Sequence, residues 1–130
     1  LDRIHLHRIH LVGYKPDPWP YFRAFEVAAL ASLSNEGIPQ SLLQAMYAHI
    51  PVVGTEVGGI PEIVVDGKTG LLAKPEDAPS LAKALARILD DADLQESFVK
   101  SAGELVRKNF QWDALGTKIE DLFRRELTGP

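Results

Sequence analysis

The chain has 130 residues, of which 45% are hydrophobic and 25% charged, and its formal net charge at pH 7 is −4. This length and composition are typical of a single globular domain, and they exclude a collagen, a coiled coil and a disordered segment. The acidic balance without a basic stripe argues against a nucleic-acid partner, and the absence of cysteine excludes disulfides and thiolate chemistry.

The sequence contains no apolar run long enough to span a membrane, and its N-terminal segment, LDRIHLHRIH, has no signal-peptide core. The sequence does not begin with Met, so we expect it to be a piece of a longer protein. The tetrapeptide RIHL occurs at 3–6 and again at 8–11, and the second copy predicts a strand over about 8–13. His5 and His7 would share one face of a strand. A zinc site needs further ligands, so we expect this face to be solvated.

Apolar runs and helical periodicity alternate through the rest of the chain. Residues 27–33 and 51–54 are short apolar runs of the kind found in buried parallel strands, and LLA at 71–73 is another. About four strands alternating with helices predict an α/β domain with a mostly parallel sheet, from which the first strands are missing. The expected helical segments are 19–25, 39–49 with Pro39 in its first turn, a turn within 55–64, 78–89 capped by Asp77, 93–108, and 112–127.

Two loops follow neighbouring strands at the edge of the sheet where ligands of such folds bind. In the first loop, SNEGIP, Glu36 is presented just before a helix whose first N–H groups, those of Gln40 and Ser41, suit a phosphate. Gln44 lies one helical turn further on and could reach the same ligand. A carboxylate that simply stabilises a helix N-terminus is the alternative interpretation.

The second loop, TEVGGIPE, places Gly58 and Gly59 after a strand, where backbone N–H groups can approach a ligand closely. A plain turn explains the glycine pair equally well. The chain has no Walker A motif, no G-x-G-x-x-G and no G-x-S-x-G. Ser32, Ser34 and Ser41 have no nearby histidine partner, and His49 is expected to be structural. Two such loops side by side therefore predict a nucleotide or phosphate cleft.

The segment from Asn35 to Asp77, NEGIPQSLLQAMYAHIPVVGTEVGGIPEIVVDGKTGLLAKPED, resembles the donor-binding half of retaining GT-B glycosyltransferases. The similarity is to glycosyltransferase family four, also called glycosyl transferases group one. It runs from about Ile9 to Phe123, and the Glu-Gly loop, the P-V-V strand, G-G-x-P-E and D-G-x-T-G-L-L occur in the family's order. The resemblance implies a Rossmann-like parallel sheet flanked by helices, namely the C-terminal domain of a GT-B fold truncated at its N-terminal side.

The resemblance also implies a function, which is the transfer of a sugar from a nucleotide-diphosphate donor to an acceptor with retention at the anomeric carbon. Such a hexosyltransferase-type enzyme needs no metal, because helix N-termini and basic side chains hold the diphosphate. The first Glu of the family's Glu-x7-Glu motif maps onto Glu36, which would bind sugar hydroxyls as the catalytic residue. The implied donor-binding residues are Gly37, Ile38, Pro39, Gln40, Ser41, Gln44, Thr55, Gly58 and Gly59.

The sequence departs from this motif at Gln44, where the family carries the Glu that binds the ribose hydroxyls. An amide accepts and donates but offers no charge-assisted bond, so we expect ribose binding to be weaker by about 1 kcal/mol. This change keeps two alternatives open, which are an inactive nucleotide-sugar-binding module and a protein-interaction domain on the same fold.

The acceptor domain and the basic clamp for the diphosphate are expected to lie outside this chain, since Lys15, Lys68 and Lys74 do not match the clamp positions. We therefore expect the isolated chain to be inactive in transfer. The resemblance associates the parent with polysaccharide or glycolipid synthesis, a glycan or lipid acceptor, and a cytoplasmic location with peripheral association at the inner face of the membrane. The last helix is expected to leave part of its apolar face uncovered.

Overall fold

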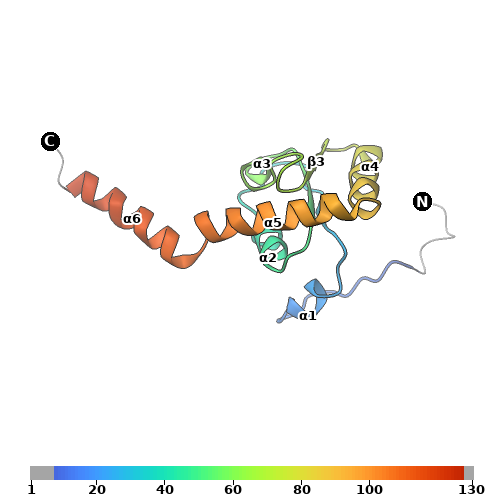
Figure 1. Cartoon of the computed structure of the whole chain (residues 1–130), viewed down its shortest axis with the longest axis horizontal. Coiled ribbons are helices and arrows are strands. Elements are labelled where there is room, and N and C mark those ends of the chain that lie inside the picture. The colour runs from blue at the N-terminus through green and yellow to red at the C-terminus, as the bar shows by residue number, and fades with distance from the viewer. Residues whose placement is uncertain (1–7, 128–130) are drawn as a thin grey trace.

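A parallel three-stranded sheet forms the centre of the molecule (Figure 1). The structure, a computed structural model, describes residues 8–127. The strands are β1 (Ala28–Leu30), β2 (Val52–Thr55) and β3 (Leu71–Ala73), in the spatial order β1-β2-β3. Val53 of β2 lies opposite Ala29 on one side and Leu71 on the other. Parallel strands joined by helices confirm the expected Rossmann-like α/β class.

The helices fall close to their predicted positions. Asp77 caps α4 as expected, because its carboxylate accepts a hydrogen bond from the Ser80 N–H at 2.8 Å. Asp91 caps α5 in the same way through the Leu94 N–H at 2.9 Å. The helices are α1 (Trp19–Phe22), α2 (Gln40–Tyr47), α3 (Ile60–Ile63), α4 (Ala78–Leu89), α5 (Ala92–Asn109) and α6 (Trp112–Leu127).

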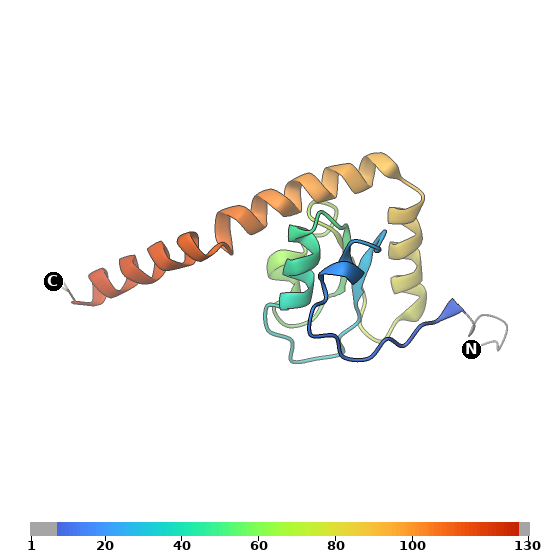
Figure 2. The same ribbon diagram turned by 90° about the horizontal axis from the view of Figure 1, so that it is seen from below.

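Two hydrophobic clusters lie on opposite faces of the sheet, because successive residues of a strand point to opposite faces. Val52 packs with α2 and α3, whereas Val53 packs with α4. The helix α5 crosses both regions and contributes Phe98 to the cluster of Val53, and Ala102 and Val106 to that of Val52. Figure 2 shows the strands between α2 and α4, with α5 running past both helices. Because helices cover both faces of the sheet, the central strand β2 has all four of its residues buried.

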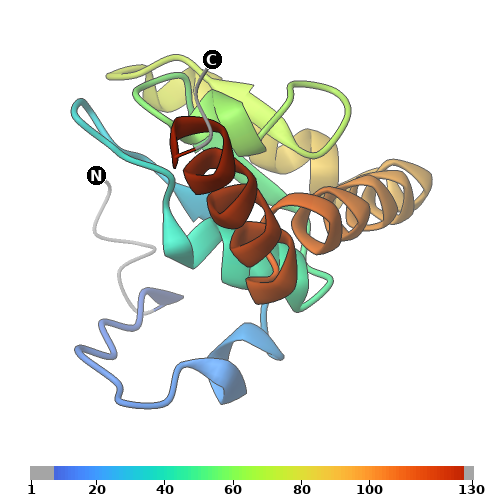
Figure 3. The same cartoon turned by 90° about the vertical axis from the view of Figure 1, so that its left-hand side faces the viewer.

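The last helix, α6, extends away from the body of the molecule in Figure 1 and lies nearest the viewer in Figure 3. Its apolar residues Ile119, Leu122 and Phe123 are 53%, 59% and 61% exposed. The expectation of an uncovered apolar face on this helix is therefore confirmed. Within the described residues, no helix combines the length and the apolar character that crossing a membrane requires.

The strand predicted over 8–13 is wrong, and the described residues form three strands rather than about four. Leu11 is 94% exposed and Gly13 has a φ of +65°. A strand gains its stability from a hydrogen-bonded neighbour, and in the described structure the sheet offers none to this segment. His5 and His7 lie outside the described residues.

Two further details differ from the sequence predictions. The strand expected at 27–33 shortens to β1, whose one neighbour in the described sheet is β2, and it is half-exposed rather than buried. Pro39 is the N-cap of α2 with an extended backbone (φ −76°, ψ 119°) rather than a residue of its first turn. An N-cap has non-helical dihedral angles, and the restricted φ of proline is compatible with them.

Candidate functional site

The two loops predicted to form the site are in direct contact at the carboxyl ends of β1 and β2. The Gly59 N–H donates a hydrogen bond to the Glu36 carbonyl at 2.8 Å. A Cβ atom on Gly58 would collide with that same carbonyl oxygen, and one on Gly59 would lie 2.8 Å from the carbonyl oxygen of Gly37. Gly58 also has a φ of +51°, which favours glycine. The glycine pair therefore lets one loop pack against the other.

The side chain of Glu36 is half-buried, and within residues 8–127 it makes a single hydrogen bond. Ser32 Oγ donates to Glu36 Oε2 at 2.6 Å, a short distance typical of a charge-assisted bond. Asn35, the residue before it, has a φ of +50°, a conformation that asparagine tolerates better than most residues. This turn carries the chain from the segment after β1 into the loop before α2, so Glu36 lies between the strand end and the helix start.

The N-terminus of α2 lies four residues beyond Glu36, and no side chain of the described residues caps it. The Leu43 N–H bonds to the Pro39 carbonyl, so the N–H groups of Gln40 and Ser41 precede the first intrahelical bond. Both residues are exposed, and Gln44 lies half-buried one turn further along α2. These N–H groups lie at the positive end of the helix dipole and can donate hydrogen bonds to an anionic group.

Thr55 ends β2 and is 3% exposed. Its Oγ1 donates to the Ser32 carbonyl oxygen at 2.6 Å, so its hydroxyl joins the two strand ends. Sequence reasoning weighed Ser32 only as a nucleophile without a histidine and missed this contact. The signal that could have indicated it is a serine four residues before Glu36, opposite a threonine at the end of the neighbouring strand.

The predicted site residues therefore cluster at one edge of the sheet, on the two loops and on α2. The chemistry that they offer is a carboxylate that accepts hydrogen bonds, beside an uncapped helix N-terminus that favours negative charge. This combination suits a ligand that carries both hydroxyl groups and phosphate.

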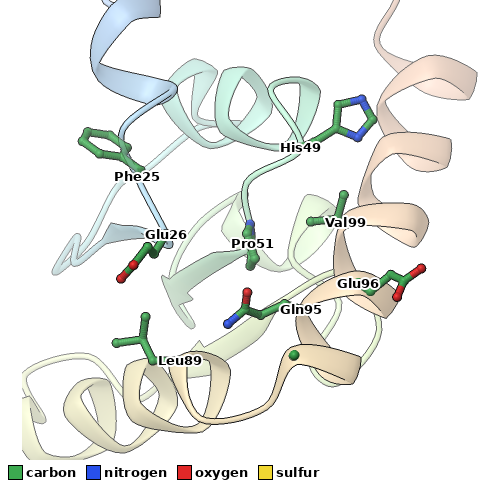
Figure 4. Close-up of a pocket in the computed structure, with 9 residues that line it drawn as sticks. Phe25, Glu26, His49, Pro51, Leu89, Gln95, Glu96 and Val99 are labelled. Carbon is green, nitrogen blue, oxygen red and sulfur yellow. The ribbon is translucent and has the colours of Figure 1, made fainter.

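The described part of the chain also has cavities at both edges of the sheet. One of about 610 Å³ opens near the amino ends of β1 and β2, where Glu26 and Pro51 precede the two strands (Figure 4). It is therefore at the opposite edge of the sheet from Glu36. A smaller cavity of about 270 Å³ includes Thr55 and Lys74 and lies at the carboxyl edge.

Residues 1–91 match a protein family described as glycosyl transferases group 1. A glycosyltransferase of Salmonella typhimurium named for colanic acid biosynthesis, WcaL, is 41% identical over 90 residues, which are 68% of this chain and 22% of that protein. A sucrose-phosphate synthase of Thermosynechococcus elongatus has a similar structure, with a TM-score of 0.74, 31% identity, and coverage of 83% of this chain and 27% of its own.

HepE of Anabaena, whose structures were solved with UDP and with UDP-glucose, has TM-scores of 0.81 and 0.80. It is 22% identical over 87% of this chain and 31% of its own, and it supports the fold alone. The chain thus spans between about a fifth and a third of the length of these relatives.

Proposed function

The chain belongs to the glycosyl transferases group 1 family, and we propose that it is the donor-binding part of a retaining glycosyltransferase that uses a nucleotide-diphosphate sugar. The observation that carries the proposal is the contact between the Glu36 loop and the Gly58–Gly59 loop beside the uncapped N-terminus of α2. HepE, which has the same fold, was solved with UDP and with UDP-glucose, which are ligands of the type proposed here.

In this proposal Glu36 accepts hydrogen bonds from hydroxyl groups of the donor sugar and orients the ring. The N–H groups of the Gly37–Ser41 segment bind the sugar and the phosphate, and the dipole of α2 stabilises the charge that develops on the leaving diphosphate. The bond between the anomeric carbon and the diphosphate oxygen breaks. The acceptor oxygen bonds to the same face of that carbon, and a phosphate oxygen of the donor takes the acceptor proton. This mechanism requires no metal and no side-chain base.

Gln44 takes the position that binds the ribose in this proposal. It lies one turn after Gln40 on α2 and can accept a hydrogen bond through its carbonyl oxygen and donate one through its amide. It lacks the negative charge of a glutamate, so its bond to a ribose hydroxyl is weaker. We expect Gln44→Glu to tighten nucleotide binding by about 1 kcal/mol, or roughly fivefold.

The remainder of the enzyme supplies what this chain lacks in the proposal. A second domain binds a glycan or lipid acceptor, and basic side chains outside the chain bind the diphosphate. Transfer would then occur in the cytoplasm, with peripheral association at the inner face of the membrane, in polysaccharide or glycolipid synthesis. The second candidate is a nucleotide-sugar-binding module without transfer activity, which the presence of Gln44 favours.

The first experiment is an NMR titration of the isotope-labelled chain with UDP-glucose, GDP-mannose and ADP-glucose up to millimolar concentration. We expect shifts of the backbone amides at 37–44 and 55–59 with one of the three nucleotides. The same titration is made on the full-length protein that the proposal implies, because basic groups outside the chain are expected to strengthen binding.

Glu36→Ala and Glu62→Ala form a matched pair for this titration. Glu36 belongs to the proposed site, whereas Glu62 is an exposed carboxylate in the first turn of α3. We expect the first variant to lose sugar-dependent affinity and the second to retain it. Absence of binding by both forms of the wild-type protein would overturn the proposed function. Binding without transfer by the full-length protein would favour the second candidate.

A further inference from the structure

Ser32 connects the buried end of β2 to the carboxylate of Glu36. Its carbonyl oxygen accepts a hydrogen bond from Thr55 Oγ1, and its own Oγ donates to Glu36 Oε2, both at 2.6 Å. Thr55 is buried, while Ser32 and Glu36 are half-buried. The three residues thus form a continuous path from the hydrophobic core to the loop of the proposed site.

This path holds a side chain that would otherwise be mobile. A glutamate has three rotatable side-chain bonds, and fixing them at the moment of binding costs conformational entropy. A hydroxyl that donates to a carboxylate forms one of the stronger hydrogen bonds in proteins. The bond to Ser32 therefore restricts Glu36 before any ligand arrives, and binding need not repeat that cost.

The bond also distinguishes the two oxygen atoms of the carboxylate. Oε2 is engaged by Ser32, whereas Oε1 has no hydrogen-bond partner in the described part of the chain. A carboxylate oxygen can accept two hydrogen bonds. Oε1 can therefore accept two from a ligand, whereas Oε2 can accept one more besides that from Ser32.

We propose that Ser32 is a positioning residue that orients Glu36 so that Oε1 accepts a hydroxyl group of the donor sugar. Thr55 contributes by fixing the backbone of Ser32, and it need not touch the ligand. The sugar-binding part of this inference rests on the proposed function, whereas the orientation of Glu36 by Ser32 can be measured without any ligand.

The chain provides matched variants for the test. Ser32→Ala removes the hydroxyl, and Ser32→Thr retains a hydroxyl at the same position. Ser34→Ala makes the same deletion two residues away at an exposed serine without a hydrogen bond in the described structure. Unfolding curves and backbone spectra of each variant establish that the fold is retained.

The first measurement is the set of three-bond couplings from Glu36 Cγ to the backbone nitrogen and carbonyl carbon, without ligand. These couplings report the χ1 angle of Glu36. We expect a single χ1 rotamer in the wild-type chain, in Ser32→Thr and in Ser34→Ala, and an average over several χ1 rotamers in Ser32→Ala. A single rotamer in Ser32→Ala would overturn the inference, whatever the chain binds.

The second measurement is the affinity for UDP-glucose, GDP-mannose and ADP-glucose in the same two forms of the protein as above. We expect Ser32→Ala to weaken sugar-nucleotide binding about tenfold, Ser32→Thr to restore it, and the free nucleotide diphosphate to bind all variants equally. If wild type binds and Ser32→Ala binds equally well, the inference fails while the proposed function stands. If wild type binds none of the donors, the proposed function and the role of Ser32 in sugar binding both fail, and the couplings alone then decide whether Ser32 orients Glu36.

Discussion

The strands β1 and β2 lie side by side in the sheet and have very different surroundings. Both are short apolar segments, AAL and VVGT, and both lie in the same parallel sheet. β2 has a neighbour on each side and is buried along its whole length, whereas β1 pairs only with β2 and remains half-exposed. A strand on each side thus buries β2, whereas the other edge strand, β3, is buried by a helix, since Leu71 and Ala73 pack against α4.

The loop that follows β1 is held in place by groups on β2 and on the loop after β2. The Glu36 loop follows the exposed strand, and it is held by groups on or after β2, namely the Thr55 hydroxyl and the Gly59 N–H. The well-buried strand thus supplies the rigid frame, and the half-exposed strand presents the carboxylate. A site built on rigid elements keeps its geometry more precise than one built on loops alone.

The largest loss of stability is expected from Gly58→Ala, which disrupts the contact between the two loops. The substitution places a Cβ against the Glu36 carbonyl at a residue with φ of +51°. Left-handed backbone strain and overpacking together should cost about 2–4 kcal/mol in the free energy of unfolding, measured by urea denaturation. Gly67→Ala is the control, since its φ of +71° carries the strain but its Cβ would meet nothing within 4 Å. Equal losses in the two variants would show that the loops do not pack closely in solution.

The next effect compares the strands themselves. Val53→Ala in β2 removes two carbon atoms from a fully buried side chain, and Leu30→Ala in β1 removes three from a half-buried one. We expect the smaller deletion to cost more, at about 2 kcal/mol against about 1 kcal/mol, because only the buried site leaves a cavity. The measurement is chemical denaturation of both variants, and a larger loss for Leu30→Ala would contradict the unequal burial.

A smaller effect is expected from Thr55→Val, which keeps the shape of the side chain and removes its hydroxyl. The Ser32 carbonyl then loses its partner, which should lower the free energy of unfolding by about 1–2 kcal/mol. Amide exchange at residues 32–36 should accelerate, while exchange in α4 stays unchanged. Uniform acceleration throughout the chain would indicate general destabilisation instead of a local bond.

The smallest effect is expected from Ala29→Glu on the exposed strand. Ala29 is exposed in β1, so a charge there should change stability by no more than about 0.5 kcal/mol. Thermal unfolding together with the mass in solution from light scattering provides the measurement. A loss of stability several times larger, together with a change in mass, would show that another copy of the chain covers β1 in solution. The difference in burial between β1 and β2 would then disappear.

The sequence predicted the parts whose signals are local. The carboxylate of Asp77 indicated the start of α4, and its bond to the Ser80 N–H follows from the short spacing between the two residues. The placement of Glu36 and Gly58 on adjacent loops followed from a general property of parallel sheets, in which strand ends share one edge. The prediction of a strand at 8–13 was wrong because alternating apolar and polar residues show only that a segment can pair as a strand. The described sheet gives this segment no partner.

The sequence by itself determined the family, the α/β class, the helices and the two loops, because periodicity, caps and motif spacing are properties of neighbouring residues. Only the tertiary structure decided that the glycine pair makes room for the backbone of the Glu36 loop, and that Ser32 connects Thr55 to the Glu36 carboxylate. The Thr55–Ser32 and Gly59–Glu36 hydrogen bonds join residues 23 positions apart in sequence, and both depend on distance and direction. Such geometry arises only when two strands pair in one register, so the local spacing of Ser32 and Glu36 could indicate the contact but not specify it.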